Sequence, residues 1–390
     1  MSTSSDGYSI GGYGAMIAER IRMDAYARAL RQVIQSNSVV LDIGTGTGIF
    51  SLLACQFGAR KVYAIEMDDA IEVAREIATA NGFVDRIQFI QDRSTRVTLP
   101  ERANVIISDL RGVLPWYGHN IDSIFDARRR LLAPGGVLIP LRDTLWGAVV
   151  EDPKLSSSIW QPWSRNAYGL NMEAAMRVVT NAWLRAELKP EQLFTEPQCL
   201  ATLDYTAIED RDLSARATWR VARDGVAHGM GVWFDATVAE GIGFSNAPGA
   251  GATEGVYGNA FFPWSAPTPL KAGDFVSVVL RADFVGQDYV WTWRTCVYEG
   301  SNGGKPKASF NQSSFLGSAV SLANLRKRAA GFMPALDDDG EIDRFILQAI
   351  DGRTPQDEIA KRTSERFPTH FRSWQEALAR VGDLSQKYSR

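Results

Sequence analysis

The sequence predicts an α/β domain, an antiparallel β domain and a small helical domain, in that order along 390 residues. Up to about residue 140, short apolar runs alternate with stretches of helical period, which is typical of a parallel sheet covered by helices. From 141 to about 315 the runs become rich in β-branched and aromatic residues, and from 316 to 390 three amphipathic helical patterns follow. We therefore expect domains at residues 1–140, 141–315 and 316–390.

Composition and charge exclude several classes of protein. The formal net charge of −3 and the pI near 5.8 argue against nucleic acid as the main partner. The three cysteines, Cys55, Cys199 and Cys296, are far apart and odd in number, and with three histidines we expect no metal site or disulfide framework. The first residues lack the pattern of a signal peptide and no stretch approaches a membrane span. A cytoplasmic protein without membrane contact is the simplest expectation.

The first domain begins with helical spacing and continues with alternating elements. Residues 13–34 predict one or two helices ahead of the first strand. The patterns that follow predict strands at 38–43, 61–67, 86–92, 103–108 and 137–150, and helices at 49–59, 68–83 and 123–136, the last stopped by Pro-Gly-Gly. Ligands of such sheets bind at the carboxyl ends of the strands, so we expect the site there.

The later domains have their own patterns. Strands of an antiparallel sandwich or barrel are predicted at 215–222, 229–239, 274–284 and 289–298. An aromatic-rich stretch at 163–183 reads as helical. In the last domain we expect helices at 341–352, 354–367 and 373–384, the first stopped by Gly352 and the second capped by Thr354.

A glycine-rich turn and one acid indicate a nucleoside ligand. Gly44, Gly46 and Gly48 follow the first strand, and Glu66 ends the second. This arrangement places a helix N-terminus beneath the ligand and a carboxylate where both ribose hydroxyls can be bound. The glycines alternate and Asp42 precedes them, so the turn departs from the G-x-G-x-x-G dinucleotide fingerprint. It resembles instead the loop of class I S-adenosylmethionine-dependent methyltransferases.

The order of several further motifs resembles the protein arginine methyltransferases. The resemblance runs from about Tyr13 to Tyr298 and includes Met16, Glu19, Arg22 and Tyr26 in MIAERIRMDAY, then VVLDIGTGTGIFSLLACQFGARKVYAIE, NGFVDRIQFI, LPERANVIISDLRG, LLAPGGVLIP, YGLNM and HGMGVWFD. It implies a Rossmann-like class I methyltransferase domain, a β-barrel substrate domain and a helical dimerisation arm at about residues 161–193. It also implies a homodimer and S-adenosyl-L-methionine as the cofactor.

Cofactor-binding residues are carried over by position from this resemblance. Arg22 is expected to hold the cofactor carboxylate, the turn at 44–48 to approach the methionine tail, Glu66 to bind the ribose, and residues 92–95 to lie near the adenine. The complete predicted set is Met16, Arg22, Asp42, Gly44, Thr45, Gly46, Gly48, Glu66, Met67, Asp92, Arg93, Ser94 and Ser108.

The active-site loop departs from the family. Two glutamates clamp the substrate guanidinium in arginine methyltransferases; the loop SDLRGVLPWYGHN has Asp109 at the place of the first and Gly118 at the place of the second. Arg111 adds a positive charge beside a pocket meant for a cation. The family's Thr-His-Trp triplet falls on residues 255–257, Gly-Val-Tyr, so the histidine is missing; Glu254 is next to it.

These departures leave the acceptor open. Asp109, Arg111, Tyr117 and His119 are the catalytic candidates, since a carboxylate acceptor would be helped by Arg111, whereas a hydroxyl or amide nitrogen needs Asp109 or His119 as a base. We rank O- or N-methylation of a precursor peptide or small biosynthetic molecule above arginine. The alternatives are a true arginine N-methyltransferase and, in another class, a leader-peptide-binding scaffold without chemistry.

The C-terminal segment carries a second, shorter resemblance. ILQAIDGRTPQDEIAKRTSERF is similar to the small winged-helix domains of the pyrroloquinoline-quinone D-protein type, which capture leader peptides. The resemblance implies that residues 316–390 bind a precursor peptide, with a peptide strand added to an edge of the domain. The alternative is a helical appendage that stabilises the fold or the dimer.

Overall fold

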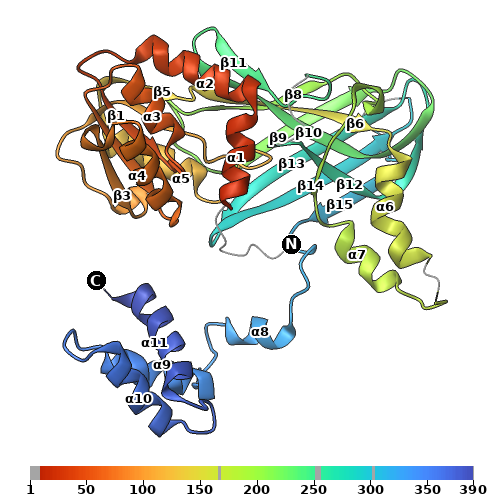
Figure 1. The fold of residues 1–390 in the computed structure, drawn as a ribbon. Coiled ribbons are helices and arrows are strands. Elements are labelled where there is room, and N and C mark those ends of the chain that lie inside the picture. The colour runs from red at the N-terminus through yellow and green to blue at the C-terminus, as the bar shows by residue number, and fades with distance from the viewer. Residues whose placement is uncertain (1–8, 166–167, 251–255, 301–303, 390) are drawn as a thin grey trace. The chain divides into compact units, whose positions relative to one another are not determined.

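The computed structural model describes residues 9–165, 168–250, 256–300 and 304–389. The chain forms two compact units, Met1–Ala319 and Val320–Arg390 (Figure 1). The first two predicted domains therefore share one unit, and the third corresponds closely to the other. Each unit is described by itself below.

A five-stranded parallel sheet forms the first half of the larger unit. Its strand order is β3-β2-β1-β4-β5, which places the first strand at the centre. All five residues of that strand, Val39–Ile43, are buried, as the apolar run predicts. The strands are β1 (Val39–Ile43), β2 (Lys61–Glu66), β3 (Ile87–Gln91), β4 (Ala103–Ser108) and β5 (Leu132–Ile139), and the helices between them are α3 (Ile49–Gln56), α4 (Ala70–Ala80) and α5 (Asn120–Arg130), with 3-10 turns at Val84–Arg86 and Ser94–Arg96.

Two helices precede the sheet, as the spacing of residues 13–34 predicts. They are α1 (Ile10–Ala18) and α2 (Arg20–Val33). Glu19 lies between the two helices. Its carboxylate accepts the backbone N–H of Arg22 and so caps the N-terminus of the second helix. Helix α2 packs one face into the core through the buried side chains of Tyr26 and Leu30. This helix also contacts strands of the antiparallel part, so it joins the two halves of the unit.

The second half of the unit consists of two antiparallel sheets. One has the order β7-β12-β10-β6-β8 with β11 paired to β10, and the other has the order β15-β14-β13-β9. The sheets bury large aromatic side chains, and the indole N–H of Trp293 on the second donates to the carbonyl of Pro263 on the first. The strands are β6 (Arg142–Val150), β7 (Leu184–Ala186), β8 (Gln198–Asp204), β9 (Leu213–Arg220), β10 (Gly225–Ala239), β11 (Ile242–Ser245), β12 (Asn259–Leu270), β13 (Phe275–Val285), β14 (Asp288–Tyr298) and β15 (Ala308–Ser313).

Two predicted boundaries between these halves are wrong. The helix expected to run to Pro-Gly-Gly ends at Arg130, and that tripeptide lies inside β5, where the register with β4 is irregular. The single strand expected at 137–150 is two strands in different sheets: β5 ends at Ile139 and β6 begins at Arg142. Pro140, which cannot donate a hydrogen bond to a sheet, and the charged Arg142 and Asp143 interrupt the apolar pattern here, so the sequence does carry a signal for the break.

The helix predicted at 163–183 is only partly present, and the longest helix of this region lies before it. Helix α6 (Pro153–Ser164) is capped by Asp152, whose carboxylate accepts the N–H groups of Lys154 and Leu155. A 3-10 turn at Glu173–Ala175 and the short α7 (Met176–Val179) follow, and residues 166–167 lie outside the described residues. From Leu184 the chain rejoins the first antiparallel sheet as β7, with a 3-10 turn at Pro190–Gln192 after it. Figure 1 shows α6 and α7 at the end of the unit away from the parallel sheet.

The smaller unit is helical and has its own core. It contains α8 (Leu322–Lys327), α9 (Asp338–Ala349), α10 (Gln356–Arg366) and α11 (Trp374–Tyr388). The expected cap Thr354 is wrong by one residue, because Pro355 takes the cap position while the carboxylate of Asp351 accepts the N–H groups of Arg353 and Thr354. Residues 320–389 contain no strand, so this unit offers no sheet edge for the peptide strand that we expected to be added. The core is Ile342, Ile346, Ile359, Ala360, Ala377 and Val381.

None of the helices described in either unit is both long and apolar enough to span a bilayer.

Candidate active site

The glycine turn forms a tight cradle at the end of β1. Gly44 and Gly46 have φ of 72° and 54°, a region that favours glycine. A Cβ atom on Gly44 would lie 2.3 Å from Leu110 Cδ2, and one on Gly46 would lie 2.3 Å from Tyr13 Cε1. The N–H of Gly46 donates to Glu66 Oε2 at 2.9 Å, so the turn and the acid at the end of β2 are held together. Leu110 and Tyr13 therefore pack directly on the backbone of the turn, and Gly44 also lines the cavities described below.

Asp42 supports the turn from inside. Its carboxylate is fully buried and accepts the hydroxyls of Thr45 at 2.6 Å and Ser51 at 2.7 Å. Burial raises the pKa of Asp42 to about 6, although these two hydroxyl hydrogen bonds oppose the rise. Asp42 therefore shapes the turn and does not face the ligand.

Two adjoining cavities open at the carboxyl ends of the strands. The first has a volume of 470 Å³ and the second 500 Å³, within the range of small-molecule sites. Gly44, Glu66 and Leu110 line both. The two cavities lie where the sequence predicts the S-adenosylmethionine site, because Glu66, the residue predicted to bind the ribose, lines both, and Arg22, the residue predicted to hold the carboxylate, lines the first.

The structure brings most of the predicted residues to these cavities. Met67, Asp92, Arg93, Ser94 and His119 line the second cavity, while Met16, Arg22, Thr45, Asp109, Arg111 and Tyr117 line the first, and Gly44 and Glu66 line both. Four predicted cofactor residues line neither: Asp42, Gly46, Gly48 and Ser108. Asp42 and Ser108 are buried under the turn and at the end of β4, and Gly46 lies beneath the ring of Tyr13.

The altered loop splits between the two cavities. His119 lines the cavity assigned to adenosine, and its Nε2 lies 2.9 Å from Oε1 of Gln287. That position separates it from Asp109, so it is poorly placed as a base for the acceptor. The N–H of Gly118 donates to Asp288 on β14, away from both cavities. Residues 254 and 255 of the other altered loop lie outside the described residues.

Asp109 is the centre of a buried charge cluster. Arg22 Nε donates to its Oδ2 at 2.7 Å, and the hydroxyl of Tyr257 lies 2.8 Å from both carboxylate oxygens. Arg111 Nη1 lies 3.5 Å from Oδ1. Burial raises the pKa of Asp109, but Arg22, Arg111 and the hydrogen bond from Tyr257 outweigh it and hold that pKa below its ordinary value. Asp109 is therefore ionised on the wall of the first cavity.

Sequence reasoning missed several residues around this cluster. Tyr257 was placed only as the third member of the altered triplet, yet its hydroxyl binds Asp109 across 148 positions of the chain. Tyr13 and Arg185 also line the first cavity, from α1 and β7. Asp143 pairs with Arg111 from the start of β6. No local pattern marks Arg185, Asp143 or Tyr257, because they reach the site from the antiparallel half, whereas Tyr13 comes from the helix ahead of the parallel sheet.

Glu66→Ala is expected to weaken S-adenosylhomocysteine binding by about 10- to 150-fold, since the loss of one hydrogen bond to a charged group costs roughly 1.5–3 kcal/mol. Calorimetry on the purified chain measures this. Glu72→Ala, an exposed acid on α4, is the control and should leave affinity unchanged. Equal affinity of the Glu66→Ala protein and the unmodified protein would contradict the ribose assignment.

The sheet order, the glycine cradle, the acid at the end of β2 and the paired cavities define a class I S-adenosylmethionine-dependent methyltransferase. Residues 26–139 match the family model of ribosomal protein L11 methyltransferase (PrmA), and residues 142–284 match the arginine methyltransferase oligomerization subdomain. The chain also shares 30% identity over 254 residues with protein arginine N-methyltransferase 1 of Dictyostelium discoideum, covering 63% of this chain and 74% of that protein. This chain belongs to the protein arginine methyltransferase family.

Other relatives agree with that assignment. Protein arginine N-methyltransferase PRMT10 of Oryza sativa subsp. japonica is 31% identical over 303 residues, covering 67% of this chain and 78% of that protein. Probable protein arginine N-methyltransferase 6 of Arabidopsis thaliana is 32% identical over 235 residues, covering 58% of this chain and 54% of that protein. The C-terminal unit lies beyond both family-model matches.

Two solved structures share the fold. Protein arginine methyltransferase 10 of Arabidopsis thaliana superposes with a TM-score of 0.67 at 24% identity, covering 78% of this chain and 97% of that chain. The Trypanosoma brucei PRMT1 enzyme–prozyme complex with AdoHcy superposes with a TM-score of 0.70 at 21% identity, covering 78% and 98%. The predicted combination of a Rossmann-like domain and a β-barrel domain is confirmed. The protein is an S-adenosylmethionine-dependent methyltransferase, which sets aside the non-catalytic scaffold.

Proposed function

We propose that the enzyme methylates a guanidinium nitrogen of arginine in a peptide or protein. The observation that carries the proposal is the ionised carboxylate of Asp109 on the wall of the first cavity, at the place where the family resemblance puts a glutamate. The names of the relatives also favour arginine over the acceptors that we ranked first from sequence. A single buried carboxylate is sufficient to bind one edge of a guanidinium.

In this proposal, some side chains bind the cofactor and others orient the acceptor. S-adenosylmethionine supplies an activated methyl group on its sulfonium when bound. Arg22 would hold the methionine carboxylate and Glu66 the ribose hydroxyls. Asp109 would accept an N–H of the acceptor and hold the nitrogen to be methylated in line with the sulfur–methyl bond. Tyr257 keeps the carboxylate of Asp109 in place from the barrel side.

Product analysis tests the acceptor. The enzyme is incubated with methyl-labelled cofactor and three peptides that differ only in carrying Arg, Lys or Glu at one central position. We expect label in the Arg peptide alone, recovered as monomethylarginine after acid hydrolysis. Label that is confined to the other peptides, or that is released by mild base as a methyl ester, would refute the proposal.

A second candidate is transfer to a carboxylate, hydroxyl or amide of a precursor peptide or small biosynthetic molecule. Two observations favour it: Arg111 lies beside Asp109, and Gly118, at the place of the second acid, turns toward Asp288. Both reduce the negative charge available to a guanidinium. Base-labile label in the same assay would support this candidate.

We also propose a homodimer formed through the arm. The match of residues 142–284 to an oligomerization subdomain supports it, as do the exposed Tyr168 and Leu170 next to α6. Leu170→Asp is expected to shift the mass in solution from dimer to monomer at micromolar concentration, because a buried charge at an interface is costly. Val285→Asp, at an exposed barrel position, should leave the dimer intact. A monomeric unmodified protein would contradict the arm assignment.

We further propose that the C-terminal unit recruits the peptide substrate. The resemblance of residues 346–367 to leader-peptide-binding domains supports the proposal, and the separate core indicates that this unit folds by itself. Deletion of residues 337–390 is expected to raise KM for a long peptide at least about tenfold, with kcat and cofactor affinity unchanged, because only binding remote from the chemistry is lost. An unchanged KM would favour a purely stabilising role.

A further inference from the structure

A line of buried charges connects the barrel to Asp109. Arg111, in the loop after β4, pairs through Nε with Asp143 Oδ2 at 3.1 Å and through Nη1 with Asp109 Oδ1 at 3.5 Å. Tyr205, immediately after β8, donates its hydroxyl to Asp143 Oδ2 at 2.6 Å. Three segments far apart in the chain therefore meet in the order Tyr205, Asp143, Arg111, Asp109.

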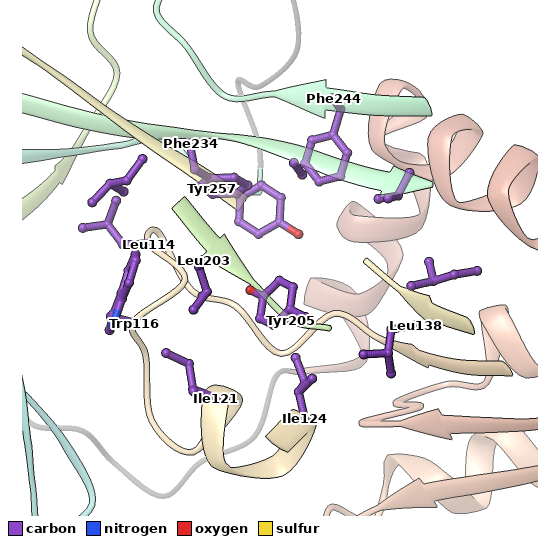
Figure 2. Close-up of a cluster of buried hydrophobic side chains, with 14 of the residues drawn as sticks. Leu114, Trp116, Ile121, Ile124, Leu138, Leu203, Tyr205, Phe234, Phe244 and Tyr257 are labelled. Atoms are coloured by element: carbon purple, nitrogen blue, oxygen red, sulfur yellow. The ribbon is translucent and has the colours of Figure 1, made fainter. Parts of the chain in front are cut away.

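The surroundings of Arg111 leave it little freedom. Its side chain is 1% exposed and that of Asp143 is 0% exposed. Its guanidinium carbon lies 5.3 Å from the ring centre of Phe234 and 5.6 Å from that of Phe244. Figure 2 shows these two rings beside Tyr257 in the buried cluster, with Tyr205 also entering it. Among the described residues Nη1 and Nη2 have no hydrogen-bond acceptor, so ion pairs and ring faces hold this group.

Asp109 has two arginine partners, Arg22 and Arg111, which differ in their other contacts. Arg22 lines the cavity and is the residue expected to turn to the cofactor carboxylate. Arg111 is anchored on its other side by Asp143, and Asp143 by Tyr205. When Arg22 is shared with the cofactor, Arg111 is the counter-charge that stays on Asp109.

We propose that Arg111, anchored by Asp143 and Tyr205, is a positioning residue that keeps Asp109 an ionised hydrogen-bond acceptor and prevents it from acting as the proton-accepting base. The role is built on the proposed function, in which Asp109 holds the acceptor. Arg111 lines the first cavity, but its side chain is 1% exposed and its guanidinium is paired with Asp109 and Asp143, so it acts on the acceptor through Asp109. The proton of the methylated nitrogen then leaves to solvent after transfer, because Asp109 does not take it.

The pKa of Asp109 depends on the charged and titratable groups packed around it. Arg22 and Tyr26 approach from α2, Arg111 from its own loop, Asp143 from β6 and Tyr257 from the segment before β12. The two arginines and the hydroxyl of Tyr257 favour the charged form, and Asp143 opposes it. Removing Arg111 and the charge of Asp143 together leaves no lone buried charge, and because the loss of Asp143 by itself would lower the pKa of Asp109, a rise in the double variant comes from the loss of Arg111.

The test is the titration of Asp109 in the full chain with bound S-adenosylhomocysteine. Aspartate carboxyl carbons are labelled with ¹³C, and the signal is assigned by its loss in Asp109→Asn. In the unmodified enzyme we expect no titration of Asp109 between about pH 5 and about pH 8. In Arg111→Met/Asp143→Asn its midpoint should rise by at least ~1 unit, and the acid limb of kcat/KM should move with it. Arg111→Lys, which keeps the charge, should restore the original profile.

The outcomes are separable from those of the acceptor assay. If the titration midpoint of Asp109 in the double variant stays within about 0.3 pH unit of the original, Arg111 does not have the proposed positioning role, even if methylarginine is formed. If the midpoint of Asp109 rises but no methylarginine is formed, the positioning role of Arg111 is supported and the proposed acceptor is refuted. If the double variant does not fold, Arg111→Gln/Asp143→Asn, which keeps a hydrogen-bond donor, replaces it with the same expected rise.

Discussion

Asp109→Asn is expected to lower methyl transfer by about 100- to 1000-fold, a larger loss than that in cofactor affinity, since the loss of one preorganised charged group in an active site has an effect of this size. Asparagine keeps the shape of the side chain but removes the charge that would hold the acceptor. Initial rates with the Arg peptide and calorimetry with S-adenosylhomocysteine measure the two quantities.

Two controls accompany this substitution. Asp283→Asn, an exposed acid on β13 paired with Arg281, should leave the rate unchanged. Asp109→Glu, which restores the longer acid of the family, should retain activity. If Asp109→Asn keeps more than about a third of the activity, Asp109 does not hold the acceptor.

Arg111→Met alone is expected to lower the free energy of unfolding by about 3–5 kcal/mol. The substitution leaves Asp143 buried without its counter-charge, with the hydroxyl of Tyr205 as its remaining partner among the described side chains. Breaking one side of a buried pair is costly because the remaining charge stays desolvated. Urea unfolding followed by tryptophan fluorescence measures the loss.

The matched comparison is a surface pair of the same chemistry. Arg60 lies 2.6 Å from Glu101 with both side chains substantially exposed, so Arg60→Met should change stability by about 0–1 kcal/mol. Adding Asp143→Asn to Arg111→Met should recover more than half of the loss, since neither charge is then left alone. Equal effects of the two arginine substitutions would show that burial of the Arg111 pair does not matter.

Local patterns were sufficient wherever a short segment decides its own structure. The buried run at 39–43, the alternating glycines and the acid at the end of β2 are adjacent in sequence, so their relation in the fold follows from strand, turn and helix geometry. The same holds for the four predicted barrel strands and the three C-terminal helices. Errors arose at Pro140, where the chain leaves one sheet for another, and at Pro-Gly-Gly, which predicts the end of a helix but lies inside β5.

The sequence by itself determined the class of enzyme, its cofactor and the residues of one side of the cavities, because these depend on contacts within a few tens of residues. Only the tertiary structure decided how Asp109 is used. Its partners Arg22 and Tyr257 lie 87 and 148 residues away, and the Asp143–Tyr205 pair behind Arg111 comes from a different sheet. The charge state of a buried carboxylate depends on its burial and on all the charges around it. Because these come from several segments, it cannot be predicted from any one segment of the chain.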